Sequence, residues 1–330
     1  MKQPCEESVS SAGEPVTICV FAYNEERTIA ATLQSISEQS YSPIVRILVG
    51  ANGCQDRTVD IAQRFAEQDP RCEVLDLSER GKARTWNVLF RLADTPVVVF
   101  VDGDQLLDRC AVAKLAEAFV AHPSAALVGA SAEEIYVPGR YLSWLFSAPA
   151  DHQRTSLSGK LYAAHRARLE RALIKAGYDG MPKRIMSDDL FLSAVASSNG
   201  LVHEREALAY GAMPKMRDRI RKEVRCHVAL LQLTREFLEL RARVDELEAQ
   251  KSESQSKFAK LKQVEGWGKR IVLVLSYPCR RLVLPVAYAL IRRRAVRIYG
   301  TSSLDAAWLR CESDKVTPLK LDGDTGGECY

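Results

Sequence analysis

The stretch that most constrains this chain is residues 96–105, PVVVFVDGDQ, in which five consecutive apolar residues run directly into two aspartates separated by one glycine. A short, valine-rich apolar run bounded by Pro and Gly predicts a strand that is buried on both faces of a parallel sheet. Ligands of open α/β sheets bind outside the carboxyl ends of the strands, so Asp102 and Asp104 are expected to face a binding crevice. Gly103 would leave room there for a ligand against the backbone. Two carboxylates at this point suit Mg²⁺ or Mn²⁺ carrying a diphosphate, and the alternative is a polar turn after a buried strand.

The N-terminal part of the chain alternates strand patterns with helix patterns. The expected strands are residues 16–23, 45–49, 72–77 and 97–101. Apolar residues at helical spacing follow the first two strands, at Ile29, Leu33 and Ile36 and at Val59, Ala62 and Phe65. Asn24 and Asp56 are candidate caps of these helices, residues 50–55 are an expected turn, and residues 80–92 an expected loop and helix. The alternation predicts a doubly wound, mostly parallel α/β sheet whose turns meet along one edge.

The turns at that edge carry side chains of complementary chemistry. They are Tyr23, Asn24, Glu25, Asn52, Asp56, Lys82, Asp102 and Asp104. An aromatic face, amides, carboxylates and a cation are suited to binding a nucleotide diphosphate. In this interpretation Tyr23 stacks on the base, Asn52 or Asp56 hydrogen-bonds its edge, and Lys82 meets a phosphate. The alternatives are a core tyrosine, simple helix caps and a solvated lysine.

The order and spacing of these motifs resemble glycosyltransferase family 2, the nucleotide-sugar enzymes of GT-A fold. The resemblance rests on AYNEE (22–26), NGCQDRT (52–58), GKARTWN (81–87), DGD (102–104), SGKLYAAHR (158–166) and SDDLFLS (187–193). It implies a GT-A domain at residues 15–226. It also implies an inverting transferase of hexosyltransferase type that moves sugar from a nucleotide-sugar donor to a hydroxyl acceptor.

The same resemblance implies roles for four acids. Asp104 would be the main metal ligand, with Asp102 on the nucleotide side, and Asp189 would be the general base. A sugar hydroxyl is a weak nucleophile, so a carboxylate must take its proton while the metal neutralises the departing diphosphate. Asp188 would raise one pKa of the acid pair if the two carboxyls face each other. The alternative is that both acids begin a helix and complement its dipole.

The chain departs from the family pattern at two positions. Ala51 and Asn52 stand where members often carry an acid pair, so the resemblance does not imply which base the donor carries. Residues 222–226, KEVRC, stand where processive, polymer-making members carry Gln-x-x-Arg-Trp, so Arg225 is present and the aromatic residue is missing. Gly159 and Arg225 are assigned to the acceptor side. We therefore expect transfer of a single sugar.

A heptad pattern follows this predicted domain. Apolar residues alternate at spacings of three and four at Leu230, Leu233, Phe237, Leu240, Val244 and Leu247. The pattern predicts an amphipathic or coiled-coil helix within residues 227–265. Such a helix would form a homodimer or pack on its own domain.

Residues 266–300 are expected to form a basic segment at a membrane interface. Residues 271–291 have the length of a membrane span, but Arg280 and Arg281 near the centre offset its eleven Leu, Ile and Val residues. Residues 266–299 contain eight Lys and Arg and no acid, which leaves the rest of the chain with a net charge of −4. Such local charge argues against nucleic-acid binding and favours an anionic membrane surface. The alternative is a basic helix pair packed on the catalytic domain.

The two ends of the chain are expected to be flexible tails, at residues 1–14 and 301–330. The first tail lacks the apolar core of a signal peptide. We therefore expect a protein peripheral on the cytoplasmic face of a membrane, with a lipid-linked or cell-envelope glycan as acceptor.

Two other functions remain open. An aspartate-nucleophile phosphatase also places Asp-x-Asp after an apolar strand, but it follows the pair with Thr or Val, where this chain has Gln105. An inactive sugar-nucleotide-binding or scaffolding relative would keep the donor site and assemble through residues 230–247.

Overall fold

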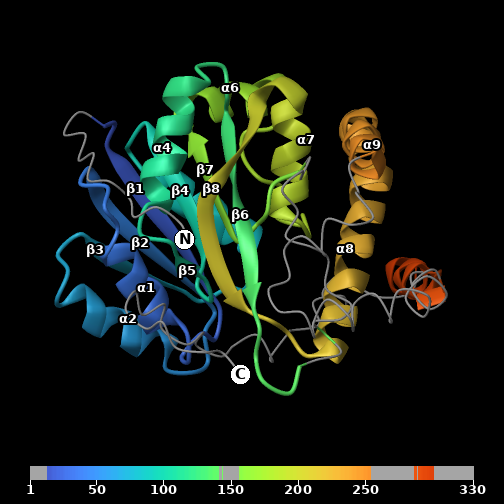
Figure 1. Ribbon diagram of the computed structural model, residues 1–330. Helices are drawn as coiled ribbons and strands as arrows, with labels where there is room; N and C mark the ends of the chain where they lie inside the picture. Colours follow the sequence, from blue (N-terminus) through green and yellow to red (C-terminus); the bar gives the residue numbers. More distant parts are fainter. Residues whose placement is uncertain (1–12, 141–142, 144–155, 254–285, 288, 301–330) are drawn as a thin grey trace, which may run out of the picture.

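An eight-stranded sheet forms the centre of the computed structural model (Figure 1), which describes residues 13–140, 143, 156–253, 286–287 and 289–300. The strands are β1 (Val16–Ala22), β2 (Ile44–Asn52), β3 (Cys72–Leu77), β4 (Val97–Asp102), β5 (Leu106–Leu107), β6 (Leu127–Ile135), β7 (Leu161–His165) and β8 (Leu201–Ala212). The helices are α1 (Ile29–Ser37), α2 (Thr58–Ala66), α3 (Lys82–Leu92), α4 (Ala111–Ala121), α6 (Arg166–Lys175), α7 (Asp188–Gly200), α8 (Met216–Glu236) and α9 (Leu238–Glu253).

The strand order is β3-β2-β1-β4-β7-β6-β8-β5. The first four strands in this order are parallel. β7 is antiparallel to both β4 and β6, β8 is parallel to β6, and β5 is antiparallel to β8. The predicted α/β sheet is thus confirmed as a mixed sheet, whose parallel half is the part with strand-helix alternation in the sequence.

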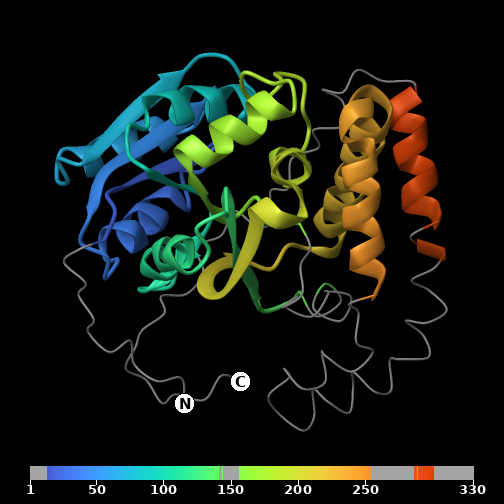
Figure 2. The ribbon, with the colours of Figure 1, turned by 90° about the horizontal axis from the view of Figure 1, so that it is seen from above.

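Strand β4 is buried on both faces, as its unbroken apolar run predicts. Val97, Val99 and Val101 belong to a core cluster with α1, α2 and α4, whereas Val98 and Phe100 belong to a second cluster with α3, α6 and α7. Helices therefore cover both faces of the sheet (Figure 2). This arrangement holds the carboxyl end of β4 fixed between two packed layers.

The predicted turn at residues 50–55 is wrong at its start, because β2 continues through Asn52. Gly50 and Ala51 pair with both β1 and β3. A Cβ added at Gly50 would lie 2.5 Å from Thr85 Cγ2 of α3. Gly50 therefore allows α3 to pack closely on β2. A glycine in this role cannot be told from a turn glycine in the sequence alone.

The heptad residues pack on their own domain. Leu233, Leu240 and Val244 are buried in the same cluster as Phe191 of α7. The pattern is divided between α8, which ends at Glu236, and α9. The side chain of Leu247 lies outside the described residues. The structure therefore supports the amphipathic-helix alternative for the described heptad positions.

The helical residues 286–287 and 289–300 lie against α8, beside α9 (Figure 2). Ile291 and Ala295 are buried against Val224 and Val228 of α8. On the same helix Arg292, Arg293, Arg294 and Arg297 are exposed. Within the described residues, no helix is long and apolar enough to cross a membrane; most of residues 271–291 lies outside that part of the chain.

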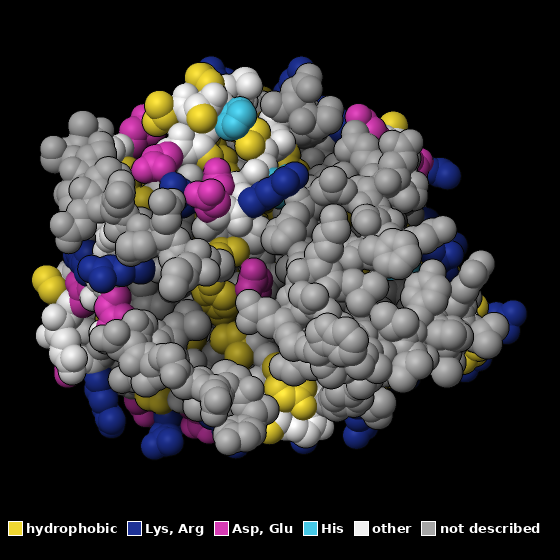
Figure 3. Space-filling view, in the orientation of Figure 1, with side chains coloured by type: hydrophobic (Ala, Val, Ile, Leu, Met, Phe, Trp, Pro, Cys, Tyr) yellow, Lys and Arg dark blue, Asp and Glu magenta, His cyan; other side chains and the backbone are white. Residues whose placement is uncertain are grey.

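Charges of both signs are mixed on the face seen in Figure 3. Lys and Arg side chains there lie interspersed with Asp and Glu side chains over the coloured, described residues. Nucleic-acid binding relies on a basic patch or stripe. The coloured part of this face shows no such stripe.

Candidate active site

Two loops at the carboxyl edge of the parallel strands are joined by hydrogen bonds. Asn24, at a φ of 53°, accepts the Gln55 N–H at 2.7 Å through Oδ1. Asp56 accepts the Glu26 N–H at 3.2 Å, and the Glu25 N–H donates to Thr58 Oγ1 at 2.6 Å. These contacts connect the end of β1 to the start of α2.

The prediction that Asn24 caps the first helix is wrong. Helix α1 begins at Ile29 with Thr28 as its N-cap, because Asn24 first takes a left-handed turn, which asparagine tolerates better than most residues. Asp56 lies one residue before the N-cap of α2, Arg57. Its Oδ1 nevertheless accepts the Thr58 N–H at 3.0 Å, so it supports the start of that helix.

Tyr23 is half-buried and carries a cation over its ring. The Arg80 guanidinium lies 5.1 Å from the ring centroid, a cation–π distance. Asn52 is buried, and its Oδ1 accepts the Gly81 N–H at 2.7 Å. Arg80, which sequence reasoning did not select, is brought beside Tyr23 by the turn before α3. Its only sequence signal is its place directly before Gly81-Lys82.

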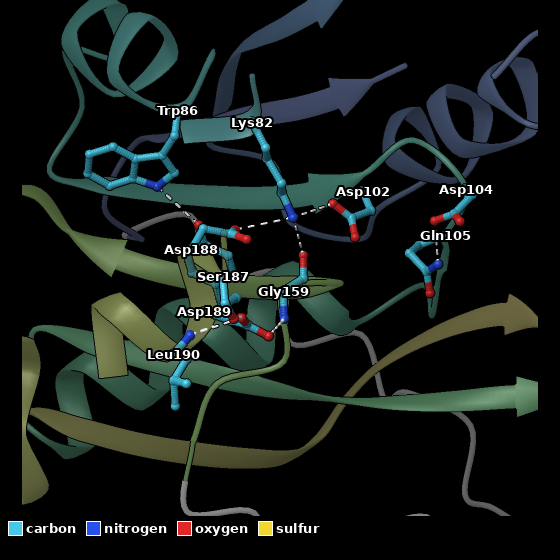
Figure 4. A network of polar contacts seen from close by, with 11 residues as sticks. Lys82, Trp86, Asp102, Asp104, Gln105, Gly159, Ser187, Asp188, Asp189 and Leu190 are labelled. Atoms are coloured by element: carbon cyan, nitrogen blue, oxygen red, sulfur yellow. Dashed lines mark hydrogen bonds and ion pairs between the residues drawn. The ribbon is translucent and has the colours of Figure 1, made fainter. Parts of the chain in front are cut away.

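Lys82 links three elements of the fold (Figure 4). Its Nζ lies 2.8 Å from Asp102 Oδ1 of β4 and 3.2 Å from Asp188 Oδ2 of α7, and it donates to the Gly159 carbonyl at 3.2 Å. Burial alone would lower the pKa of Lys82, but Asp102 and Asp188 outweigh it and raise that pKa. Lys82 is therefore a mostly buried cation fixed between carboxylates of β4 and α7. It is not the solvated loop lysine of the alternative interpretation.

Asp189 is oriented by three donors. Its Oδ2 accepts the Gly159 N–H at 3.2 Å, and its Oδ1 accepts the Leu190 N–H at 2.9 Å and the Ser187 hydroxyl. Gly159 thus touches Lys82 through its carbonyl and Asp189 through its N–H. The acids at the end of β4 and those at the start of α7 consequently share one polar network (Figure 4).

Asp104 lies on the far side of Asp102 from the acid pair (Figure 4). Gln105 Nε2 donates to its Oδ1 at 2.6 Å. Burial raises the pKa of Asp102, Lys82 lowers it, and Asp104 adds to the rise. The two acids of the Asp-Gly-Asp motif are therefore close enough to feel each other's charge.

Gly103 packs against the protein backbone, which corrects the expectation that it leaves room for a ligand. Its N–H donates to the Phe21 carbonyl at 2.8 Å. A Cβ added there would lie 2.9 Å from that carbonyl oxygen and 3.3 Å from Glu25 Cγ. A side chain at this position would push the end of β4 away from β1.

Helix α8 contributes several cations, of which the sequence analysis selected only Arg225. Arg219 pairs with Glu134 of β6 and donates to Ser143 Oγ at 2.9 Å. Burial would raise the pKa of Glu134, but Lys160, Arg219 and Lys222 together lower it. Lys222 also acts on Asp102, whose pKa it lowers against the larger effect of burial. The half-buried Arg225 lies one turn further along α8.

Residues 17–167 match the family model described as glycosyl transferase family 2. These residues form a family 2 glycosyltransferase domain. The match covers every loop described above except the acid pair of α7 and the cations of α8. The roles of all the individual site residues remain predictions.

Curated relatives match about a third of this chain. The glycosyltransferase AglD of Haloferax volcanii is 30% identical over 115 residues, which is 33% of this chain and 18% of that protein. EpsJ of Bacillus subtilis, an uncharacterized glycosyltransferase, is 32% identical over 102 residues, 31% of this chain and 29% of that protein. The aligned part spans less than a third of either relative's length.

Solved structures extend the similarity beyond the matched family segment. The mannosyltransferase PcManGT from Pyrobaculum calidifontis, in complex with GDP-Man and Mn²⁺, has a TM-score of 0.58 at 20% identity, with 91% of each chain covered. At this identity the likeness shows the fold alone, and it confirms the predicted GT-A type.

The Asp-Gly-Asp motif of the family 2 domain suits a divalent ion that brings other ligands with it. Within the residues that the structure describes, no group of three or more His, Cys, Asp and Glu side chains is arranged to hold a metal. Asp102 and Asp104 supply two carboxylates, and Mg²⁺ commonly binds one or two carboxylates together with substrate phosphates and water. Asp102 also pairs with Lys82, so Asp104 stays the predicted main ligand.

The acid pair at the start of α7 predicts a pH-dependent stability. Burial raises the pKa of Asp188 to about 6 from a usual value of 3.8, with Lys82 opposing and Asp189 adding to the rise. Since the unfolded chain ionises first, this group's contribution to stability is complete below pH 3.8 and is lost as the pH rises through 6. The Asp188→Asn variant lacks this titration. The difference between its free energy of unfolding and that of wild type should therefore rise by up to about 3 kcal/mol between pH 4 and pH 7. Urea unfolding at both pH values checks this, and a constant difference would contradict it.

Proposed function

We propose that this chain transfers one sugar from a nucleotide-sugar donor to a hydroxyl acceptor, with inversion and with a bound divalent ion. The family 2 domain supports the reaction class. The observation that carries the proposal is the network in which Lys82 and Gly159 join the acids after β4 to the acid pair of α7. One polar network thereby offers groups for both halves of a transfer.

On the donor side, Asp104 and Asp102 would hold Mg²⁺ or Mn²⁺. Such an ion would neutralise charge on the departing nucleotide diphosphate. The structural relative PcManGT is in complex with GDP-Man and Mn²⁺. Tyr23 and Arg80 would flank the base, and Asn24, Glu25, Asn52 and Asp56 would hold the loops around it. Lys82 positions Asp102 relative to Asp188.

On the acceptor side, Asp189 would be the general base. The acceptor oxygen forms a bond to the anomeric carbon as the bond from that carbon to the diphosphate oxygen breaks, and the hydroxyl proton passes to Asp189. A single displacement from the opposite face inverts the anomeric centre. The bonds from Gly159, Ser187 and Leu190 orient the carboxylate, and Arg225 would contact the acceptor.

Release of nucleotide tests this proposal. We expect the protein, incubated with a panel of nucleotide sugars and divalent ion, to release free nucleotide from at least one of them, and EDTA to stop the release. Readdition of Mg²⁺ or Mn²⁺ should restore it. Release that persists unchanged in EDTA would contradict the metal-dependent reaction, and donor binding without release would favour the inactive sugar-nucleotide-binding relative.

We further propose that the exposed arginines of residues 289–300 hold the protein on the anionic, cytoplasmic face of a membrane, where a lipid-linked or envelope glycan would be the acceptor. Ile291 and Ala295 face α8, whereas Val286 and Leu290 are 60% and 59% exposed. Basic residues near an anionic surface contribute about 1 kcal/mol each. The helix therefore presents cations together with apolar side chains, as interfacial helices do.

Replacing Arg292, Arg293, Arg294 and Arg297 with glutamine is expected to weaken binding to phosphatidylserine vesicles about 100-fold or more. Vesicle sedimentation at physiological salt measures this. The matched control replaces four exposed arginines elsewhere, Arg64, Arg91, Arg109 and Arg205, and should bind as wild type does. If both variants lose vesicle binding equally, the binding depends on net charge and not on the position of these arginines.

A further inference from the structure

A hollow of about 350 Å³ lies behind the sheet edge that is opposite the candidate active site. It is formed where α6, α7 and α9 meet the segment that leads into β6. Four of its lining residues are cations, Arg168, Arg171, Lys175 and Arg243. We call it the basic hollow. Its volume lies at the lower end of the range for small-molecule sites.

The basic hollow is separate from the active-site network. Asp188 begins α7, whereas the hollow contacts Val195, Ala196 and Gly200 at the end of the same helix. A helix of this length separates its ends by about 18 Å. Strand β7 also shows that the two sites lie at opposite edges of the sheet. Its first residue, Leu161, pairs with Val101 at the active-site edge, and its last, His165, pairs with Val97 at the opposite edge, directly before α6.

The lining is cationic without a counter-charge. Arg168, Arg171 and Lys175 recur at i, i+3 and i+7, which places them on one face of α6, and Arg243 adds a charge from α9. The lining residues include no Asp or Glu. Among the described residues these four cations form no ion pair, while the neighbouring Arg166 does, with Glu170. Four uncompensated charges around a concavity attract an anion.

Backbone contacts fix two of the guanidinium groups in place. Arg243 Nη1 donates to the Ala194 and Val195 carbonyls at 3.1 and 3.0 Å, and Arg168 Nη1 donates to the Ala125 carbonyl at 3.1 Å. A guanidinium has five N–H donors, so each retains donors for a ligand. Burial lowers the pKa of the adjacent His165, and Arg168 and Arg171 lower it further. The cations therefore make the hollow electropositive, and two of their guanidinium groups have fixed positions.

Small residues create the space between these cations. Ala126, Ala172, Ala196 and Gly200 line the hollow. Complementing the carboxyl ends of α6 and α7 would explain cations at these positions, since their charge suits that end of a helix. It would not explain a small-residue concavity between them.

We propose that the basic hollow binds a phosphate-bearing anion at a site distinct from the nucleotide-sugar donor. Arginine forks match phosphate oxygens in bidentate geometry, and the ring of charge suits a diphosphate or a phosphomonoester. This site does not depend on the proposed function, because none of its residues belongs to the donor or acceptor network.

Calorimetric titration of the full chain with inorganic pyrophosphate tests the site. EDTA is present throughout, because the donor-side proposal requires a divalent ion. We expect saturable binding that Arg171→Gln/Lys175→Gln weakens at least about tenfold, since charge-assisted hydrogen bonds carry such differences. Both side chains are exposed, so the variant should melt as wild type does. The control Arg64→Gln/Arg91→Gln carries the same charge change on exposed positions of α2 and α3 and should bind as wild type does.

A second arm separates free anions from lipid headgroups. Vesicles with phosphatidic acid present the same phosphate on a surface, and a headgroup ligand would make their binding sensitive to Arg171→Gln/Lys175→Gln but not to the change of the four arginines of residues 289–300. Pyrophosphate binding that shows no saturation, or that both double variants weaken equally, would overturn the proposal.

Discussion

Asp189→Asn is expected to lower the rate of sugar transfer by about 10²–10⁴-fold while leaving donor affinity unchanged. The amide keeps the shape of the side chain but cannot take the acceptor proton, and general bases contribute rate factors of this size. Nucleotide release in the presence of acceptor measures the rate, and a titration with donor and metal measures affinity. The Gly159 and Leu190 N–H groups bond different oxygens of Asp189, so the amide oxygen retains one of these two hydrogen bonds.

Asp179→Asn is the matched control for this variant. Asp179 is exposed in the loop between α6 and α7, and the substitution removes the same charge without touching the network. It should retain wild-type rates. Transfer by Asp189→Asn at a rate within about threefold of wild type would show that Asp189 is not the general base, because loss of a general base lowers the rate much more than this.

Lys82→Met is expected to lower the free energy of unfolding at neutral pH by about 3 kcal/mol. The lysine side chain is 18% exposed and its partner Asp188 10%, so removing the cation leaves mostly buried carboxylates without compensation. Loss of one member of a buried pair typically costs about 3–5 kcal/mol, and the partial exposure of Asp102 places the value at the low end. Urea unfolding at pH 7.5 measures the change.

A second substitution distinguishes charge imbalance from lost packing. Asp188→Asn in the Lys82→Met background should recover part of the stability, because it removes one of the uncompensated charges. Lys114→Met on α4 is the control, since its partners Glu117 and Glu206 are 57% and 74% exposed and such surface pairs contribute little. If Lys82→Met and Lys114→Met lose equal stability, the network does not hold the two acid sets together.

The parallel half of the sheet could be predicted from sequence because its information is local. Each strand there is an apolar run followed within a few residues by a helix pattern, and residues 72–77 match β3 residue for residue. Strands β6 and β8 are half-buried and carry no comparable run, and β7 is only five residues long. The topology of that half depends on packing, which periodicity does not encode.

The candidate site could be predicted as a set of motifs but not as a network. Residue order placed the acids at strand and helix ends, where backbone geometry is regular. The contacts that join them depend on how α3 and α7 lie on the sheet, so the position of Lys82 between Asp102 and Asp188 required the structure. Lys222 lies in the segment 222–226 that was compared with a family motif, but its effect on Asp102 depends on how α8 lies relative to β4 and could not be read from the sequence.

Helix α8 contacts both the candidate site and the helical residues 289–300. Near its start its cations border the acidic residues of the site, and further along Val224, Val228 and Ala229 are covered by Ile291 and Ala295. Deleting residues 286–300 would therefore uncover an apolar strip on the helix that also carries cations of the candidate site. A shortened chain would then lose solubility and turnover together, for reasons unrelated to lipid, whereas point replacement of the outward arginines leaves that strip sealed.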